Sequence, residues 1–152
     1  MSDQVPRFGT QVEGVEYRDR PGGYAIVARQ GGEIALVQTA KGLFLPGGGQ
    51  DPGETPEAAA VREAREECGF TISIRSRVGE ADEYVVESSA GRHLRKRCTF
   101  FLADLVSEEE GGEPDHQVVW MSPSLAAERL THGSQRWAVR AAFGIPLEVV
   151  RE

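Results

Sequence analysis

Several features that define other protein classes are missing from this sequence. The chain of 152 residues has only two cysteines, Cys68 and Cys98, too few for a disulfide framework or a cysteine-based zinc site. Its longest apolar run, residues 24–28, is far shorter than a membrane span. Residues 1–4 lack the basic and apolar regions of a secretion signal. These absences predict an intracellular, cytoplasmic protein with no membrane partner.

Positive charge is also scarce. The chain has 17 lysine and arginine residues against 24 aspartate and glutamate residues, a formal net charge of −7 at pH 7. An acidic protein repels the phosphates of nucleic acids, so general binding to DNA or RNA is not expected. A small anionic substrate is compatible with this charge if a cation lies between the substrate and the protein.

The length and composition favour a single domain over residues 1–152 with a mixed α/β or α+β fold. Two apolar runs, at 24–28 and 34–37, flank Gly31-Gly32 and predict a β-hairpin. The Pro-Gly-Gly-Gly run at 46–49 is expected to be irregular. Further strands are predicted at 71–74, 84–86, 99–106 and 118–121. Two later helices are predicted, one from Ser122-Pro123 to about residue 130 and one from a cap at Ser134 to Gly144.

The clearest predicted helix spans residues 56–68. Thr55 is suited to the N-cap and Gly69 to the C-terminal stop. On a helical wheel Glu63, Glu66 and Glu67 share an arc about 100° wide. Like charges three and four positions apart repel, and a solvated polar face is the ordinary explanation for such an arc. Neighbouring Arg62 compensates part of the repulsion, but Mg²⁺ would compensate more, because it prefers carboxylate oxygens, water and phosphates as ligands.

The segment before this helix adds to the argument for a metal. Gly47, Gly48 and Gly49 permit positive φ angles and close backbone approach, although an ordinary glycine loop would look the same. Asp51 and Glu54 place two more carboxylates in this loop. Together the loop and the helix predict a site for a metal and a phosphate group.

Across residues 48–70 the sequence reads Gly48-x5-Glu54-x7-Arg62-Glu63-Ala64-x-Glu66-Glu67-x-Gly69-Phe70. This segment resembles the Nudix box of the MutT/Nudix hydrolases, Gly-x5-Glu-x7-Arg-Glu-U-x-Glu-Glu-x-Gly-U, where U is an apolar residue. Every fixed position matches, and Ala64 is smaller than the usual U residue. A match of this kind arises by chance about once in 10⁹ windows of average composition. The resemblance implies a Nudix-type α/β/α sandwich with a mixed central sheet.

The resemblance also implies a reaction, in which water attacks phosphorus in a nucleoside diphosphate linked to another moiety. The implied cofactor is Mg²⁺, with Mn²⁺ as a substitute. The implied catalytic residues are Arg62, Glu63, Glu66 and Glu67, and the implied metal ligands are Glu63, Glu66, Glu67 and a carbonyl of Gly47 or Gly48. The general base is not fixed across this family. Glu63 is one candidate here, and Glu113 and Asp115 are others unless they are solvated loop acids.

Residues outside the box supply candidates for substrate binding. Arg95 and Arg97 lie in a basic stretch at 92–97 that would grip the outer phosphates of a polyphosphate or RNA, or else protect a strand edge. Phe44 and Tyr84 are candidates to stack a nucleobase, although aromatic residues more often pack in a core. His116 and His132 have no ligand spacing.

The leading hypothesis is a pyrophosphohydrolase for nucleoside triphosphates or dinucleoside polyphosphates. An RNA 5′-pyrophosphohydrolase and a non-catalytic nucleotide-binding module of the same fold are the alternatives. Homodimers are common in the family, and residues 1–20 are the segment that would contribute to one.

Overall fold

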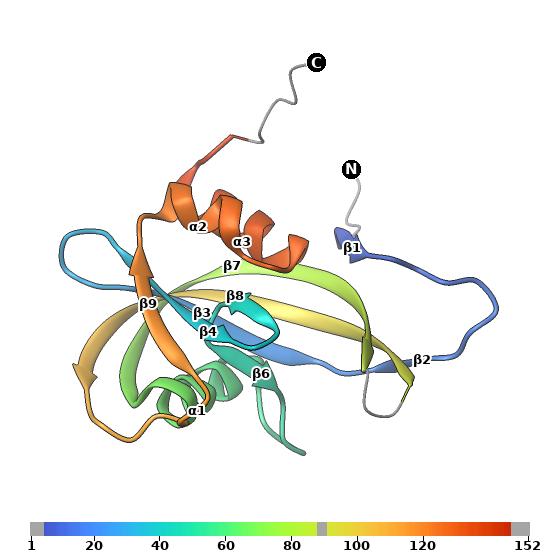
Figure 1. Ribbon diagram of the computed structural model, residues 1–152, viewed down its shortest axis with the longest axis horizontal. Helices are drawn as coiled ribbons and strands as arrows, with labels where there is room; N and C mark the ends of the chain where they lie inside the picture. Colours follow the sequence, from blue (N-terminus) through green and yellow to red (C-terminus); the bar gives the residue numbers. More distant parts are fainter. Residues whose placement is uncertain (1–4, 88–90, 147–152) are drawn as a thin grey trace.

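The computed structural model describes residues 5–87 and 91–146 (Figure 1). Its elements, in chain order, are β1 (Arg7–Gly9), β2 (Tyr17–Asp19), β3 (Gly22–Ala28), β4 (Ile34–Thr39), β5 (Gly42–Phe44), β6 (Gly47–Gly49), α1 (Pro56–Cys68), β7 (Phe70–Glu87), β8 (Arg92–Glu108), β9 (Gln117–Met121), α2 (Pro123–Arg129) and α3 (Gly133–Phe143). None of the described helices is long and apolar enough to cross a membrane.

The strands form one mixed sheet between two layers of helix. Its main path runs β1-β7-β8-β3-β4-β5, while β2 pairs with β8, β6 with β3 and β9 with β4. The β3–β8 pair is parallel, whereas β7–β8 and β4–β9 are antiparallel. Helix α1 lies on one face of the sheet, and α2 and α3 lie on the other (Figure 1). The predicted α/β/α sandwich with a mixed central sheet is confirmed.

Alternation along the central strand β3 divides the core between the two faces. Ala25 and Val27 belong to the apolar cluster under α1. Tyr24 and Ile26 belong to the larger cluster that packs against α2 and α3. Because β3 is buried on both faces, it reads in the sequence as a continuous apolar run.

The predicted hairpin and the first helix are confirmed. Strands β3 and β4 pair antiparallel across the Gly31-Gly32 turn. Helix α1 has the predicted bounds because its signals are local: the Thr55 side chain accepts a hydrogen bond from the Ala58 N–H, and Gly69 adopts the left-handed conformation at φ 73°.

Three other predictions of secondary structure are corrected by the structure. Residues 47–49 of the glycine run form strand β6, which pairs antiparallel with β3, so they are not irregular. The segments 71–74 and 84–86 are extended as predicted, but they belong to one strand, β7, whose pairing with β8 continues through three register shifts. Helix α3 has His132 rather than Ser134 at its N-cap. In the first two cases the partner strand, not the local sequence, determines the conformation.

Candidate active site

Glycines allow α1 to lie close to strands β3 and β6. A Cβ atom on Gly23 would overlap the backbone oxygen of Pro56 at the start of α1. A Cβ atom on Gly48 would lie 2.8 Å from Oε2 of Glu63. The helix therefore rests directly on the glycine strands, and its carboxylates face β6.

Strand β6 leaves one edge free, and that edge faces α1. The residues just before and just after β6 make backbone hydrogen bonds across the β3–β6 pair. Because bonded and non-bonded residues alternate in an antiparallel pair, Gly48 is the residue of β6 that bonds to β3. The flanking glycines point their polar groups the other way. The Gly47 N–H donates to Glu67 Oε1 at 2.8 Å, and the Gly49 carbonyl accepts from Arg62 Nη2 at 3.0 Å. Of the two carbonyls proposed as metal ligands, that of Gly47 is the one that faces the carboxylates.

Arg62 holds the carboxylates of the helix and the loop together. Its Nη1 donates to Glu63 Oε1 at 2.7 Å and to Glu66 Oε2 at 3.1 Å. Its Nε donates to Glu54 Oε2 at 2.9 Å, and this hydrogen bond lowers the pKa of Glu54 to about 2. Asp51 lies 3.3 Å from the same nitrogen. Glu63 and Glu66 each give one oxygen to Arg62 and keep the other available.

Glu67 is a mostly buried carboxylate that contacts the Gly47 N–H. Its side chain is 12% exposed, and burial raises its pKa to about 7, against the effect of the Gly47 N–H. Burial also raises the pKa of Glu63. Two neighbouring carboxylates that resist ionisation in the metal-free protein are suited to a cation, because a bound ion reverses this penalty.

The donor set fits Mg²⁺. The glutamates and the free Gly47 carbonyl offer only oxygen atoms, which are the ligands this ion prefers. Glu63 and Glu67 are the inner carboxylates, whereas the side chain of Glu66 is 51% exposed and lies at the outer end. Water molecules would supply the ligands that the protein does not.

A second cluster of potential ligands lies beside the first. Within the described residues, Glu113, Asp115 and His116 bring ligand atoms within 4.8 Å of one another. His116 Nε2 lies 3.4 Å from Glu67 Oε2. Burial lowers the pKa of His116, but these neighbouring acids outweigh it and raise the pKa above its usual value. The loop before β9 thus reaches α1 through His116, whose proximity had no signal in the sequence. Glu113 and Asp115 lie beside His116, and a role for either of them in the site stays a prediction.

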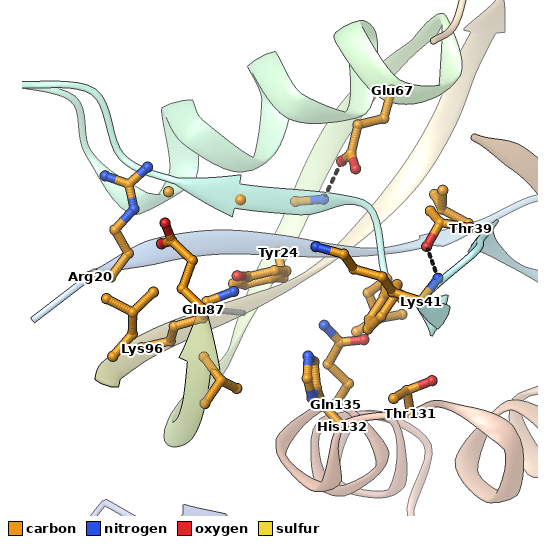
Figure 2. Close-up of a pocket in the computed structure, with 18 of the residues that line it drawn as sticks. Arg20, Tyr24, Thr39, Lys41, Glu67, Glu87, Lys96, Thr131, His132 and Gln135 are labelled. Carbon is orange, nitrogen blue, oxygen red and sulfur yellow. Dashed lines mark hydrogen bonds between the residues drawn. The ribbon is translucent and has the colours of Figure 1, made fainter. Parts of the chain in front are cut away.

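Of these groups, Gly47, Glu67 and His116 line a cleft of about 510 Å³ on the α3 side of β6 (Figure 2). This volume is typical of sites for small molecules. The lining residues come from most parts of the chain: Arg20, Tyr24, Val37, Thr39, Lys41, Phe44, Leu45, Gly47, Gly48, Gly49, Glu67, Val85, Val86, Glu87, Leu94, Lys96, His116, Thr131, His132 and Gln135.

The two aromatic candidates have different positions. Phe44 lines the cleft, with its ring centroid 5.1 Å from that of His132. Tyr84 is buried outside the cleft lining and packs edge to face against Tyr17 at 5.1 Å. The structure therefore brings Phe44, but not Tyr84, to the cavity.

The basic stretch is divided by the alternation of strand β8. Arg95 pairs with Asp19 at 2.7 Å, and Arg97 pairs with Asp82. Neither arginine lines the cleft, whereas Lys96 between them does. Sequence reasoning identified the stretch but not the face of the strand that borders the cavity.

Comparison with known proteins places this site in a family. The profile of the NUDIX domain matches residues 18–142. A Bacillus subtilis protein named "Putative 8-oxo-dGTP diphosphatase" is 40% identical over 60 residues, 38% of this chain and 40% of its own length. "Nudix hydrolase 4" of Arabidopsis thaliana is 30% identical over 113 residues, 72% of this chain and 50% of its own length. A solved Nudix hydrolase from Nitrosomonas europaea superposes with a TM-score of 0.67 at 18% identity, covering 89% of this chain and 97% of its own.

The chain belongs to the NUDIX domain family, because the matched segment covers most of the chain, from β3 to β9 with α1, α2 and most of α3. The chain spans half or less of the length of these two curated relatives. The likeness to the Nitrosomonas structure concerns the fold alone.

Proposed function

We propose that this protein is a Mg²⁺-dependent pyrophosphohydrolase that cleaves a nucleoside diphosphate linked to another moiety. The contact between Glu67 and the Gly47 N–H carries the proposal. It fixes a buried carboxylate beside a free backbone carbonyl at the edge of a cleft of substrate size. The family relationship supports the same reaction class.

Each residue of the site has a distinct task. A bound Mg²⁺ polarises phosphoryl oxygens and acidifies a coordinated water. Glu67, with the Gly47 carbonyl and the free oxygens of Glu63 and Glu66, would hold the ion. Arg62 positions Glu63 and Glu66 by donating a hydrogen bond to one carboxylate oxygen of each.

The chemical step requires a proton acceptor. As the water oxygen bonds to phosphorus, the anhydride P–O bond breaks and its electron pair leaves with the departing phosphate group. The water proton passes to a carboxylate. Glu63 Oε2 on the helix is one candidate, as an alternative to its role as a metal ligand, and the carboxylates of Glu113 and Asp115 in the loop are the others.

Activity measurements on matched variants test this proposal. Glu67→Gln should lose several orders of magnitude in Mg²⁺-dependent phosphate release, because it removes a charged ligand but retains an oxygen for the Gly47 N–H. Glu57→Gln removes the same charge from the exposed first turn of α1 and should keep its turnover. Equal turnover in both variants would reject the assigned metal site. Nucleotide binding without turnover would favour the binding-module alternative.

The RNA alternative has less support than the sequence suggested, since Arg95 and Arg97 are paired with carboxylates outside the cleft. Cytoplasmic location, one domain over residues 1–152 and a homodimer stay predictions of the sequence.

A further inference from the structure

The cleft has two chemically different ends (Figure 2). Arg20 and Lys96 lie toward one end, and His132 lies toward the other, with the ring of Phe44 5.1 Å from its own. The side chain of Lys41 points toward Tyr24 between the two ends. Glu67 and the Gly47 N–H that it contacts form the border of the cleft that we call the catalytic edge. A substrate whose diphosphate contacts the catalytic edge would therefore meet different surroundings in the two directions.

The aromatic end is held rigidly. The Leu43 N–H donates to Thr131 Oγ1 at 2.9 Å, and the Leu45 N–H donates to Gln135 Oε1 at 2.8 Å. These bonds fix β5 against the start of α3 and place the ring of Phe44 beside that of His132. Burial lowers the pKa of His132, which favours a neutral ring at pH 7. Such a pair suits a flat nucleobase.

The opposite end offers charge instead of aromatic surface. Among the described residues, the cleft-lining Arg20, Lys41 and Lys96 form no ion pair, in contrast to Arg92, Arg95 and Arg97, which each pair with a carboxylate. Two of the three, Arg20 and Lys96, lie at this end, which gives it an excess of positive charge in a protein of net charge −7. Arg20 lies against Gly49, where a Cβ atom would come within 3.0 Å of its guanidinium carbon.

The one acid at this end does not cancel the excess. Glu87 bonds to Arg92 at 2.7 Å. That hydrogen bond lowers the pKa of Glu87, and the charges of Arg20 and Lys96 lower it further. Three cations thus surround one carboxylate. The other lining residues here are Val85, Val86 and Leu94, and none of them is aromatic.

We propose that the substrate is a mononucleoside 5′-polyphosphate with a free terminal phosphate, bound with its base at Phe44 and His132 and its outermost phosphate at Arg20 and Lys96. This inference rests on the proposed function and narrows it. A dinucleoside polyphosphate would place a second base, and a nucleoside diphosphate sugar a neutral ring, at the cationic end. Neither group matches charges that favour a doubly ionised phosphate.

The test compares kcat/KM for nucleoside triphosphates, dinucleoside tetraphosphates and nucleoside diphosphate sugars with Mg²⁺. The preferred triphosphate should exceed the other two classes by about ten-fold or more. Arg20→Gln and Lys96→Gln should each lower its kcat/KM by about ten-fold, mainly through KM, and change turnover of the sugar substrate less than about two-fold. Arg75→Gln, whose exposed guanidinium pairs with Asp104 on β7 and β8, is the matched control and should leave both values unchanged.

Failure of this inference is distinct from failure of the proposed function. Turnover of dinucleoside tetraphosphates equal to that of triphosphates, with no effect of Arg20→Gln, would overturn the inference and leave the hydrolase intact. If no substrate is cleaved, calorimetry with a non-hydrolysable α,β-methylene triphosphate supplies the second readout. About ten-fold weaker binding in both variants supports the inference, and unchanged binding overturns it.

Discussion

Replacement of Glu67 by glutamine should make the metal-free protein more stable at alkaline pH. The pKa of Glu67 is raised to about 7 by burial, from an ordinary value near 4.5. A carboxyl with a raised pKa favours folding when protonated. Its contribution is fully present below about pH 4.5 and is lost as the pH rises through 7.

The size of the effect follows from the pKa shift. At 1.36 kcal/mol per pKa unit, ionisation of Glu67 costs the folded state about 3 kcal/mol at most. The Glu67 side chain is still 12% exposed, and solvent screening lowers the cost of ionising it, so we expect this cost to be about 2 kcal/mol. Glu67→Gln removes the charge, so its midpoint of thermal unfolding at pH 8 should exceed that of the wild type by about 4–8 °C. At pH 4.5 the two proteins should unfold together.

The assay is urea and thermal unfolding at both pH values, first in EDTA and then with Mg²⁺. The ion should stabilise the wild type at pH 8, since it binds the folded form, and should stabilise Glu67→Gln much less. Glu57→Gln controls for the loss of one negative charge. A Glu67→Gln protein less stable than the wild type in EDTA at pH 8, or equally stabilised by Mg²⁺, would refute the reasoning.

Two further predictions concern the glycines under α1. Gly23→Ala should lower the free energy of unfolding by about 3 kcal/mol, because its Cβ overlaps the helix backbone, whereas Gly53→Ala, with open space but φ +80°, should cost only about 1 kcal/mol. Urea unfolding of the two variants checks this, and equal losses would contradict it. Gly48→Ala should displace Glu63, lowering Mg²⁺-dependent turnover by about ten-fold or more while changing stability by less than about 1 kcal/mol. Full turnover in the Gly48→Ala variant would contradict the assignment of Glu63 to the active site.

The features that the sequence predicted best are those that depend on residues close together in the chain. The bounds of α1 follow from Thr55, Pro56 and Gly69, and the acidic arc follows from helical spacing alone. The sequence could not show that residues 47–49 form a strand, because glycine has no preference that identifies one and the pairing partner lies more than 20 residues away.

The substrate end of the cleft was predicted less well. Side chains alternate between the two faces of β8, so either the odd-numbered or the even-numbered residues face the cleft. Nothing in the sequence of the basic stretch shows that Lys96, and not Arg95, is on that face. Arg20 and Lys41 come from connections between strands that carry no motif, so only the folded chain brings them to the cavity. Tyr84 and Phe44 are similar in the sequence, but only one of them reaches the cleft.

The contacts of Arg62 have a consequence for the exchange of ions. Its guanidinium already balances part of the negative charge and braces Glu54, Glu63 and Glu66 against one another. If the ion left with the product, these ion pairs with Arg62 would remain, and they would still balance part of the repulsion among the carboxylates. We expect the backbone of helix and loop to stay in one arrangement from turnover to turnover, which lets a fresh ion enter without any refolding.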